Sequence, residues 1–163
     1  VSVAYSTATN AVYMKMEVGK GLYRIYRTDA NYDTRRIYVQ TSHIGKIAVF
    51  YDEDRFFYDN VKTGDVFMFN GTEGGWRVIN PPGRYRLIGV DKDKNIYIAK
   101  VNTDDKVLSV SRGQLGVGFK TIDTYDTPKD LQDVTVASVL KDEQSGSNSS
   151  GSDSSSDSSS KKK

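Results

Sequence analysis

The 163-residue sequence contains no cysteine and a single histidine. Without cysteine, the chain has neither disulfides nor a thiolate zinc site. The histidine, His43, would have to serve any Ser–His–acid triad, yet no motif surrounds it, and we interpret it as a surface turn residue. Since neither a nucleophile–base pair nor a set of metal ligands appears, we expect a non-enzymatic protein that holds no cofactor and no metal.

Long apolar runs and a strong charge imbalance are also absent. No run approaches the ~18 apolar residues of a membrane-spanning helix. The chain carries 23 Lys and Arg against 21 Asp and Glu, a formal net charge of +2. This balance does not favour a nucleic acid or a membrane surface, so we expect neither as a partner.

One short motif begins like a calcium-binding loop and then departs from that pattern. Asp91–Asn95 supplies the oxygen-bearing residues with which such a loop starts. However, Ile96 stands where the sharp turn needs Gly, and Asn102 replaces the bidentate Glu. We therefore reject a calcium site in this segment.

Short apolar runs alternate with polar turns from Lys46 to Ser111, at a pitch of about ten residues. The turns are rich in Gly, Pro, Asn and Asp, which supply positive φ, a fixed φ or a local hydrogen bond. The pattern predicts an all-β fold, an antiparallel meander that forms one domain over residues 1–125. The clearest runs are Lys46–Tyr51, Phe56–Tyr58, Val66–Phe69, Trp76–Ile79, Leu87–Val90, Ile96–Ile98 and Val107–Val110.

The meander repeats itself with a period of about 40 residues, which is the form of propeller blades of four strands each. Val49–Phe69 is echoed by Val90–Val107, and a partial third copy begins near Arg36. The runs are also apolar on both faces of a strand, since Ala48 and Phe50 alternate with Ile47 and Val49. Strands of this kind lie between two other layers, as blades do.

The number of blades leaves the architecture open at this point. The pattern holds about three blades, whereas propellers close with about four to eight. The chain is therefore part of a longer propeller, closes by association as a homo-oligomer, or is a compact β-sandwich or up-and-down barrel. Because residue 1 is Val rather than Met, we expect that a signal peptide or a preceding domain has been removed.

The C-terminal part differs in kind from the meander. Residues 126–141 predict a short helical or strand extension: Thr127–Asp130 has the features of a helix start, and Val134–Val136 also suits a strand. Residues 142–163 are rich in Ser and Asp, end in three Lys, and predict a disordered tail. In this tail Ser150 and Ser154 each precede an Asp by three residues, which predicts phosphorylation.

Asn70 opens the sequon Asn70–Thr72 on a predicted turn. It is therefore a candidate glycosylation site if the protein is secreted.

Several motifs, taken in order, resemble a known family. Val3–Ser6, Gly21–Ile25, Gln40–Ala48, Gly64–Val66 and Leu87–Ile98 are similar to segments of the closing blades of the yellow/major royal jelly family, which are secreted arthropod β-propellers. The resemblance covers roughly residues 3–110. It implies a secreted, extracellular propeller that binds a small ligand or contributes to extracellular material.

The departures from the family bear on its ligand site. The cysteine of the family motif falls at Met68, so that disulfide cannot form, and a pocket Ser/Thr falls at about Arg86. The resemblance implies a pocket or channel rim at Asn102, Tyr97 and Trp76. Small molecules or other proteins are the expected partners, and the alternative function is an extracellular matrix or interaction module that acts through the Ser/Asp-rich tail.

Overall fold

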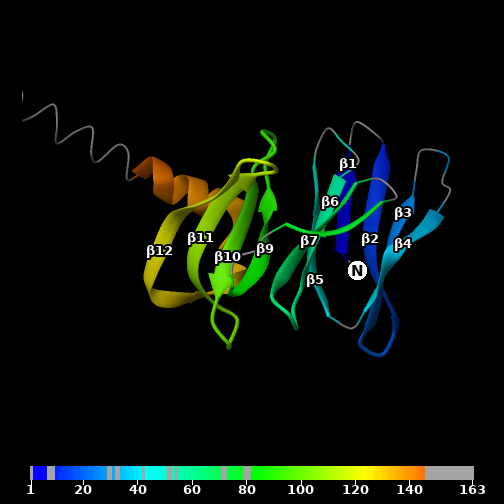
Figure 1. Ribbon diagram of the computed structural model, residues 1–163, viewed down its shortest axis with the longest axis horizontal. Helices are drawn as coiled ribbons and strands as arrows, with labels where there is room; N and C mark the ends of the chain where they lie inside the picture. Colours follow the sequence, from blue (N-terminus) through cyan, green and yellow to red (C-terminus); the bar gives the residue numbers. More distant parts are fainter. Residues whose placement is uncertain are drawn as a thin grey trace, which may run out of the picture.

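The computed structural model describes residues 2–6, 10–28, 31, 34–41, 43–50, 53, 55–70, 73–78 and 82–145; the side chains of residues 2, 6, 34–41, 70 and 73–77 are not described. The described strands form three open antiparallel sheets of four consecutive strands each (Figure 1). Sheet A contains β1 (Ser2–Ser6), β2 (Ala11–Gly19), β3 (Leu22–Thr28) and β4 (Thr34–Thr41). Sheet B contains β5 (Ile44–Val49), β6 (Arg55–Asn60), β7 (Asp65–Asn70) and β8 (Glu73–Arg77). Sheet C contains β9 (Arg84–Val90), β10 (Ile96–Val101), β11 (Lys106–Gln114) and β12 (Gly118–Asp130).

The three sheets lie in a row, with sheet B between sheets A and C (Figure 1). The first strand of sheet B, β5, contacts the first strands of both neighbours, β1 and β9. Each sheet is thus a meander whose first strand lies nearest its neighbours. This arrangement confirms the predicted propeller-like blades and rules out a closed barrel for the described strands.

Sheet B is buried on both faces, as the sequence predicts. Ile47 and Val49 belong to the core between sheets A and B, whereas Ala48 and Phe50 belong to the core between sheets B and C. The same alternation holds along β7, where Phe69 faces sheet A. The apolar runs are therefore explained by two cores, one on each side of a single sheet.

An aromatic cluster forms the centre of the core between sheets A and B. Phe56 is fully buried. Its ring lies 4.9 Å from that of Tyr13 on sheet A and 5.0 Å from that of Phe69 on β7, measured between centroids. Ring pairs at these distances add stabilisation beyond the area that they bury.

One glycine permits sheets B and C to approach each other closely. Gly64 has φ +75°, and a Cβ at this position would lie 2.8 Å from the Cα of Arg84 at the start of β9. Any side chain here would strain the backbone and clash with β9. The turn between β6 and β7 therefore needs glycine.

The C-terminal segment differs from the prediction in where its helix begins. Thr127–Asp130 is the end of β12 and pairs with β11 through Val107↔Lys129 and Lys106↔Asp130, so the predicted helix start at Thr127 is wrong. After a 3₁₀ turn, η1 (Leu131–Asp133), the chain forms an α-helix over residues 136–145.

This helix begins with a reciprocal cap. The Ser138 amide donates to Thr135 Oγ1 (3.1 Å), and the Thr135 amide donates to Ser138 Oγ (2.9 Å). The geometry is that of a capping box, with Ser in place of Glu. Val134 and Val139 are buried against the face of sheet C that points away from sheet B.

Tyr58, on β6, leads to a prediction for alkaline pH. Burial raises its pKa to about 12. Above pH ~10 the unfolded chain ionises this phenol while the folded chain does not, so the free energy of unfolding falls between about pH 10 and 12. We expect the Tyr58→Phe variant to show a shallower fall in urea unfolding measured across this range.

Tyr125 provides a second, independent test in the same experiment. Burial is also the main cause that raises its pKa to about 12. Tyr125→Phe should therefore remove a separate part of the alkaline fall. If Tyr58→Phe keeps the full wild-type pH dependence, the assignment to Tyr58 is wrong.

Candidate functional site

A fully buried carboxylate joins sheets B and C near the first strands of these two sheets, β5 and β9. Asp59, on β6, is 0% exposed. Within its own sheet it accepts a hydrogen bond from the Lys46 amide (2.6 Å). From β9 it accepts the Leu87 amide (2.8 Å) and Arg86 Nε (2.8 Å). Because a buried charge needs such partners, Asp59 fixes the position of β9 against sheet B.

Arg86 extends this network to the turn between β10 and β11. Its Nη1 donates to Asp105 Oδ2 at 3.2 Å, while its Nε remains on Asp59. The guanidinium is therefore shared between two carboxylates. Its positive charge is neutralised by protein groups.

Sheet A reaches the same region through Lys15. The Lys15 ammonium donates to the carbonyl oxygen of Gly45 at 2.6 Å. Burial lowers the pKa of Lys15; the charge of Asp59 raises it and that of Arg86 lowers it further. We call Lys15, Asp59, Arg86 and Asp105 the inner polar cluster; all three sheets contribute to it or contact it.

Gly45 leaves the space that this cluster occupies. A Cβ on Gly45 would collide with Asp59 Oδ1 and would lie 2.8 Å from Arg86 Nη2. The approach of the two charged side chains to β5 therefore depends on the absence of a side chain at this position.

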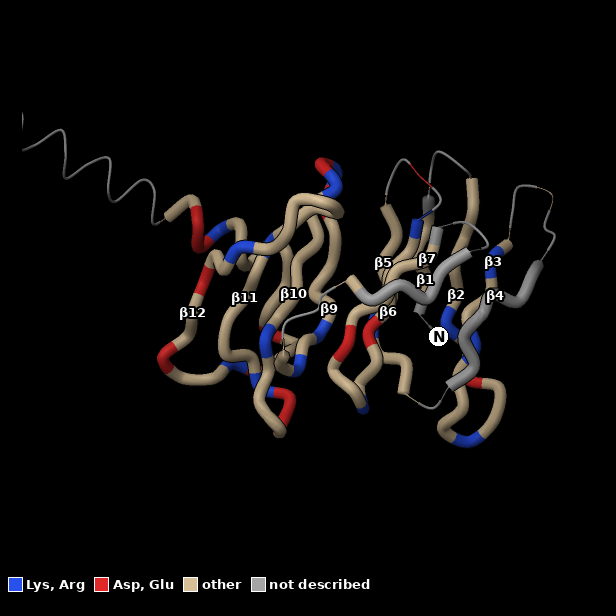
Figure 2. Tube along the Cα trace, viewed as in Figure 1, with Lys and Arg blue, Asp and Glu red and all other residues tan. Residues whose placement is uncertain are grey.

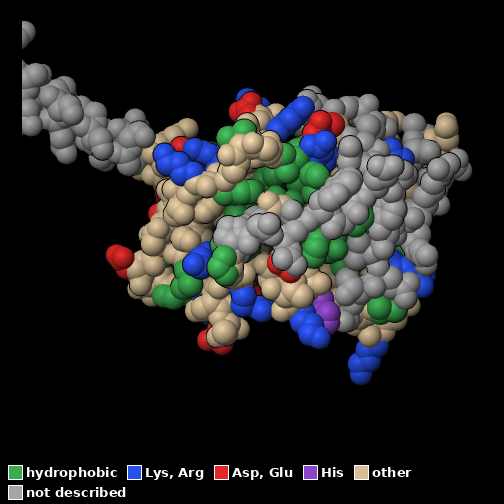
Figure 3. Space-filling view, viewed as in Figure 1, with side chains coloured by type: hydrophobic (Ala, Val, Ile, Leu, Met, Phe, Trp, Pro, Cys, Tyr) green, Lys and Arg blue, Asp and Glu red, His purple; other side chains and the backbone are tan. Residues whose placement is uncertain are grey.

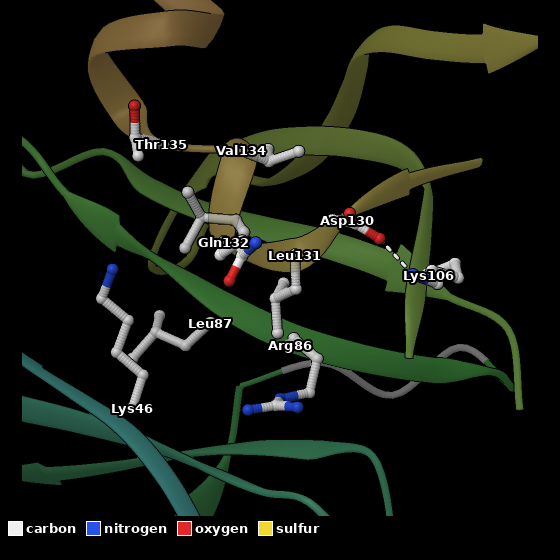
Figure 4. Close-up of a pocket in the computed structure, with 10 residues that line it drawn as sticks. Lys46, Arg86, Leu87, Lys106, Asp130, Leu131, Gln132, Val134 and Thr135 are labelled. Carbon is white, nitrogen blue, oxygen red and sulfur yellow. Dashed lines mark hydrogen bonds and ion pairs between the residues drawn. The ribbon is translucent and has the colours of Figure 1, made fainter. Parts of the chain in front are cut away.

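A cavity of about 630 Å³ adjoins the inner polar cluster, between the first strands of sheets B and C and the C-terminal segment (Figure 4). Its wall comes from β5, β9, the start of β11, the end of β12, and η1 with the residues after it. The lining residues are Lys46, Arg86, Leu87, Ile88, Lys106, Asp130, Leu131, Gln132, Val134 and Thr135.

The cavity combines an apolar wall with one uncompensated cation. Leu87, Leu131 and Val134 supply the apolar part. Lys106 is paired with Asp130, so its charge is balanced at the rim. Lys46 is exposed, and its ammonium forms no ion pair with any residue that the structure describes. In Figure 4 this ammonium and the Gln132 carboxamide point toward the same space.

A second cavity, of about 330 Å³, lies between sheets B and C near the turn that joins β9 to β10. Here Glu53 pairs with Arg55 and Lys94, so positive and negative groups are matched. Figure 2 shows that charged residues gather at strand ends, and Figure 3 shows hydrophobic side chains in the seam between these sheets. This cavity is smaller, and its two cations, Arg55 and Lys94, are both paired with Glu53, so it is the weaker candidate for an anion site.

The structure does not bring the residues of the predicted rim together. Tyr97 is 1% exposed near the start of β10 and donates to Asp91 Oδ2 at 2.8 Å. Asn102 follows the other end of β10, where its Oδ1 accepts the Asp104 and Lys106 amides (3.0 Å each). At about 3.3 Å per residue the two lie roughly 16 Å apart.

Trp76 lies on β8, but its side chain is outside the described part of the chain. Neither Tyr97 nor Asn102 lines the larger cavity. A ligand-binding role for the three residues stays a prediction.

The Asp91–Asn95 segment is a hydrogen-bonded turn. Asp91 accepts hydrogen bonds from Asn95, Asp93 and Tyr97. Burial acts to raise the pKa of Asp91, but these hydrogen bonds outweigh it and hold the pKa below its usual value. Within the described residues, no group of three or more His, Cys, Asp or Glu is placed to hold a metal ion.

The predicted modification sites are only partly covered by the structure. Asn70 is the last residue of β7, and its side chain is outside the described part. Ser150 and Ser154, with the whole stretch from residue 146 onward, lie outside the described residues. No helix within the described residues is long and apolar enough to cross a membrane.

The sequence analysis did not identify Asp59, Lys46 or Gln132 as site residues. Asp59 ends an aromatic run on the same strand face as Phe57, so a carboxylate stands where the alternation predicts an apolar residue. That signal is local and could have been used. Lys46 and Gln132 carry no such signal, because their proximity depends on how the C-terminal segment crosses sheet C.

Comparison with known proteins supports the fold. No protein-family model matches the chain, and no curated protein matches it. Among solved structures, a chain of the nidogen/laminin complex matches with a TM-score of 0.59 and 14% identity, over 78% of this chain and 49% of that one. TolB from Acinetobacter baumannii matches with a TM-score of 0.59 and 14% identity, over 79% and 33%. A luciferin-regenerating enzyme matches with a TM-score of 0.52 and 10% identity, over 76% and 45%.

At these identities the likeness concerns the fold alone. The chain spans half or less of the length of the structures that it matches. The matched structures are of the propeller type, in agreement with three sheets of four consecutive antiparallel strands. The described chain is thus a row of three propeller-like blades with a C-terminal helix.

Proposed function

We propose that this chain is a propeller-type binding module whose larger cavity, between sheets B and C, takes a small organic anion with an apolar part. The observation that carries the proposal is the ammonium of Lys46, which stands beside the apolar wall without a carboxylate partner among the described residues. A carboxylate on a small molecule would supply that partner.

The size and lining of the cavity support a small ligand. About 630 Å³ falls within the range of known small-molecule sites, which are largely apolar with a few placed polar groups. Leu87, Leu131 and Val134 would cover the apolar part of the ligand, and the Gln132 amide could donate to its carboxylate.

The charges around the cavity explain why an anion fits better than a cation. Arg86 is already neutralised by Asp59 and Asp105, and Lys106 by Asp130. Lys46 is the remaining charge. A bound cation would add repulsion, whereas a bound anion would complete the balance.

Two resemblances, one to a solved structure and one to a protein family, extend the proposal beyond the cavity. The nidogen/laminin match is a structure of a protein complex, which supports an interaction role for such blades. We also propose that the chain is secreted, has no enzymatic activity and is related to the yellow/major royal jelly family. The alternative, an interaction module that acts through the tail, predicts that removal of residues 146–163 abolishes partner binding.

A binding experiment with simple carboxylates tests the proposed site. We expect hexanoate and benzoate to shift NMR signals of residues around Lys46 and Gln132, whereas hexanamide and benzamide should bind more weakly. Because a hydrogen bond to a charged group contributes about 1.5–3 kcal/mol, Lys46→Ala should weaken carboxylate binding by about ten- to a hundredfold.

Lys92→Ala is the matched control, since Lys92 is an exposed lysine in the turn after β9 and does not line the cavity. It should bind as the wild type does. Equal affinity of the wild type and Lys46→Ala, or equal binding of acids and amides, would refute the proposed site.

A further inference from the structure

One continuous stretch of the chain both forms a wall of the larger cavity and covers the outer face of sheet C. Four of its residues line the cavity, and the helix over residues 136–145 follows them directly. In Figure 4 these residues lie on one side of the cavity and Lys46 lies on the other. We call residues 131–145 the C-terminal strap. Its lining residues are Leu131, Gln132, Val134 and Thr135.

The strap is held on sheet C by a small number of apolar side chains. Val134 and Val139 are buried, whereas Val136 and Leu140 are only partly buried. Gly89 on β9 permits the close approach, because a Cβ at this position would lie 2.9 Å from Val136 Cγ2. A helix this short is marginal in water by itself. The docked strap is therefore stabilised mainly by its contacts with sheet C.

An ion pair fastens the far end of the helix. Arg112 on β11 donates from Nη1 and Nη2 to the two carboxylate oxygens of Glu143, at 3.1 and 3.3 Å. The two side chains are 29% and 41% exposed, so solvent screens the pair and it adds little stability. Few buried apolar contacts and an exposed ion pair are the features of a segment that opens locally, without unfolding of the sheets beneath it.

Detachment of the strap would remove part of the proposed binding site. A carboxylate held by Lys46 would lose the Gln132 carboxamide and the apolar cover of the strap. The ligand therefore binds the docked form more tightly than the detached form, and this difference in affinity shifts the equilibrium toward docking. The coupling is reciprocal, because changes that favour docking of the strap also favour ligand binding.

We propose that the C-terminal strap is a ligand-responsive element. A carboxylate in the larger cavity holds it on sheet C, and an empty cavity lets it detach more often. This inference rests on the proposed function and adds a regulatory role to the same site. Gly89 and Val139 are then positioning residues, since neither lines the cavity and each acts on the ligand only through the strap.

Hydrogen exchange of the full chain measures the docking of the strap. The helix amides from Val139 onward should exchange faster than the amides of sheet C when no ligand is present. Hexanoate at about ten times its dissociation constant should slow their exchange about tenfold, because ligand that binds only the docked form stabilises it by mass action. Hexanamide, or hexanoate added to Lys46→Ala at the same concentration, should slow it much less.

Val139→Asp tests the coupling in the opposite direction. An unpaired carboxylate beneath the helix favours detachment, so the apparent affinity for hexanoate should fall at least tenfold, in proportion to the docked fraction. Gly89→Ala is a milder second variant, which displaces Val136 and should also weaken binding. Ala137→Asp is the matched control, since Ala137 is exposed on the same helix and does not line the cavity. It should bind hexanoate as the wild type does.

Two results would overturn this inference while leaving the proposed function intact. One is helix exchange that saturating hexanoate does not slow. The other is wild-type affinity for hexanoate in both Val139→Asp and Gly89→Ala. A wild-type chain that binds no hexanoate would instead refute the proposed function, and this inference with it.

Discussion

Replacing Asp59 by alanine is expected to lower the free energy of unfolding by about 3–5 kcal/mol, the cost of breaking a buried ion pair by removing one partner. Asp59 is fully buried and accepts hydrogen bonds from Arg86 and from two backbone amides, on β5 and β9. Its loss leaves these donors without their acceptor at the contact between sheets B and C. Urea unfolding of the variant and the wild type measures the difference.

Two further variants make this result specific. Asp105→Asn alters the other carboxylate that pairs with Arg86. Because the Asp105 side chain is 35% exposed, this change should lower the free energy of unfolding by less than about 1 kcal/mol. Arg86→Leu in the Asp59→Ala background removes the guanidinium that has lost its buried partner and should recover part of the loss. A cost below about 1 kcal/mol for Asp59→Ala would contradict the role assigned to this carboxylate.

Phe56→Ala is expected to be comparably severe, at about 3–5 kcal/mol, because it opens a cavity in the core between sheets A and B. The ring is fully buried and packs on Tyr13 and Phe69. Hydrogen exchange should show the larger loss of protection in sheets A and B and the smaller loss in sheet C.

Val117→Ala provides the comparison for a surface site. Val117 is 80% exposed, and truncating it should change stability by no more than about 0.5 kcal/mol. If Phe56→Ala unfolds with the wild-type midpoint, or if protection falls equally in all three sheets, the aromatic cluster does not hold sheets A and B together.

The fold was predictable because its signals are local and repeated. Turn residues at regular intervals marked the strands, and the alternation along Ile47–Phe50 showed that both faces of one sheet are buried. The number of strands per sheet followed from the repeat. The alternatives of a sandwich or a barrel were left open because the pattern holds only about three blades, whereas propellers close with about four to eight.

The helix was misplaced because two segments have similar capping signals. Thr127 followed by Pro128 has the composition of a helix start, but its backbone pairs with β11. Thr135 begins the helix instead, with Ser138 as its reciprocal partner. Pairing with a neighbouring strand overrides a local capping preference, and sequence alone does not show which one prevails.

The site was less predictable than the fold, because it depends on contacts between distant segments. Lys46 and Gln132 meet only through the path of the C-terminal segment across sheet C. Arg86 was noticed as a departure from the family pattern, and the structure gives that position a role in the inner polar cluster. Tyr97 and Asn102, chosen by resemblance, instead stabilise turns at opposite ends of β10.

The position of Asp59 also affects the order in which the sheets fold while the chain is being synthesised. Each sheet consists of consecutive strands, so each is complete as soon as its fourth strand has left the ribosome. Asp59 nevertheless needs sheet C, because its partner Arg86 follows 27 residues later. Until β9 emerges, the carboxylate lacks the guanidinium and the Leu87 amide, and burying it is unfavourable. Sheet B therefore reaches its final packing only together with sheet C, although all its strands are made earlier.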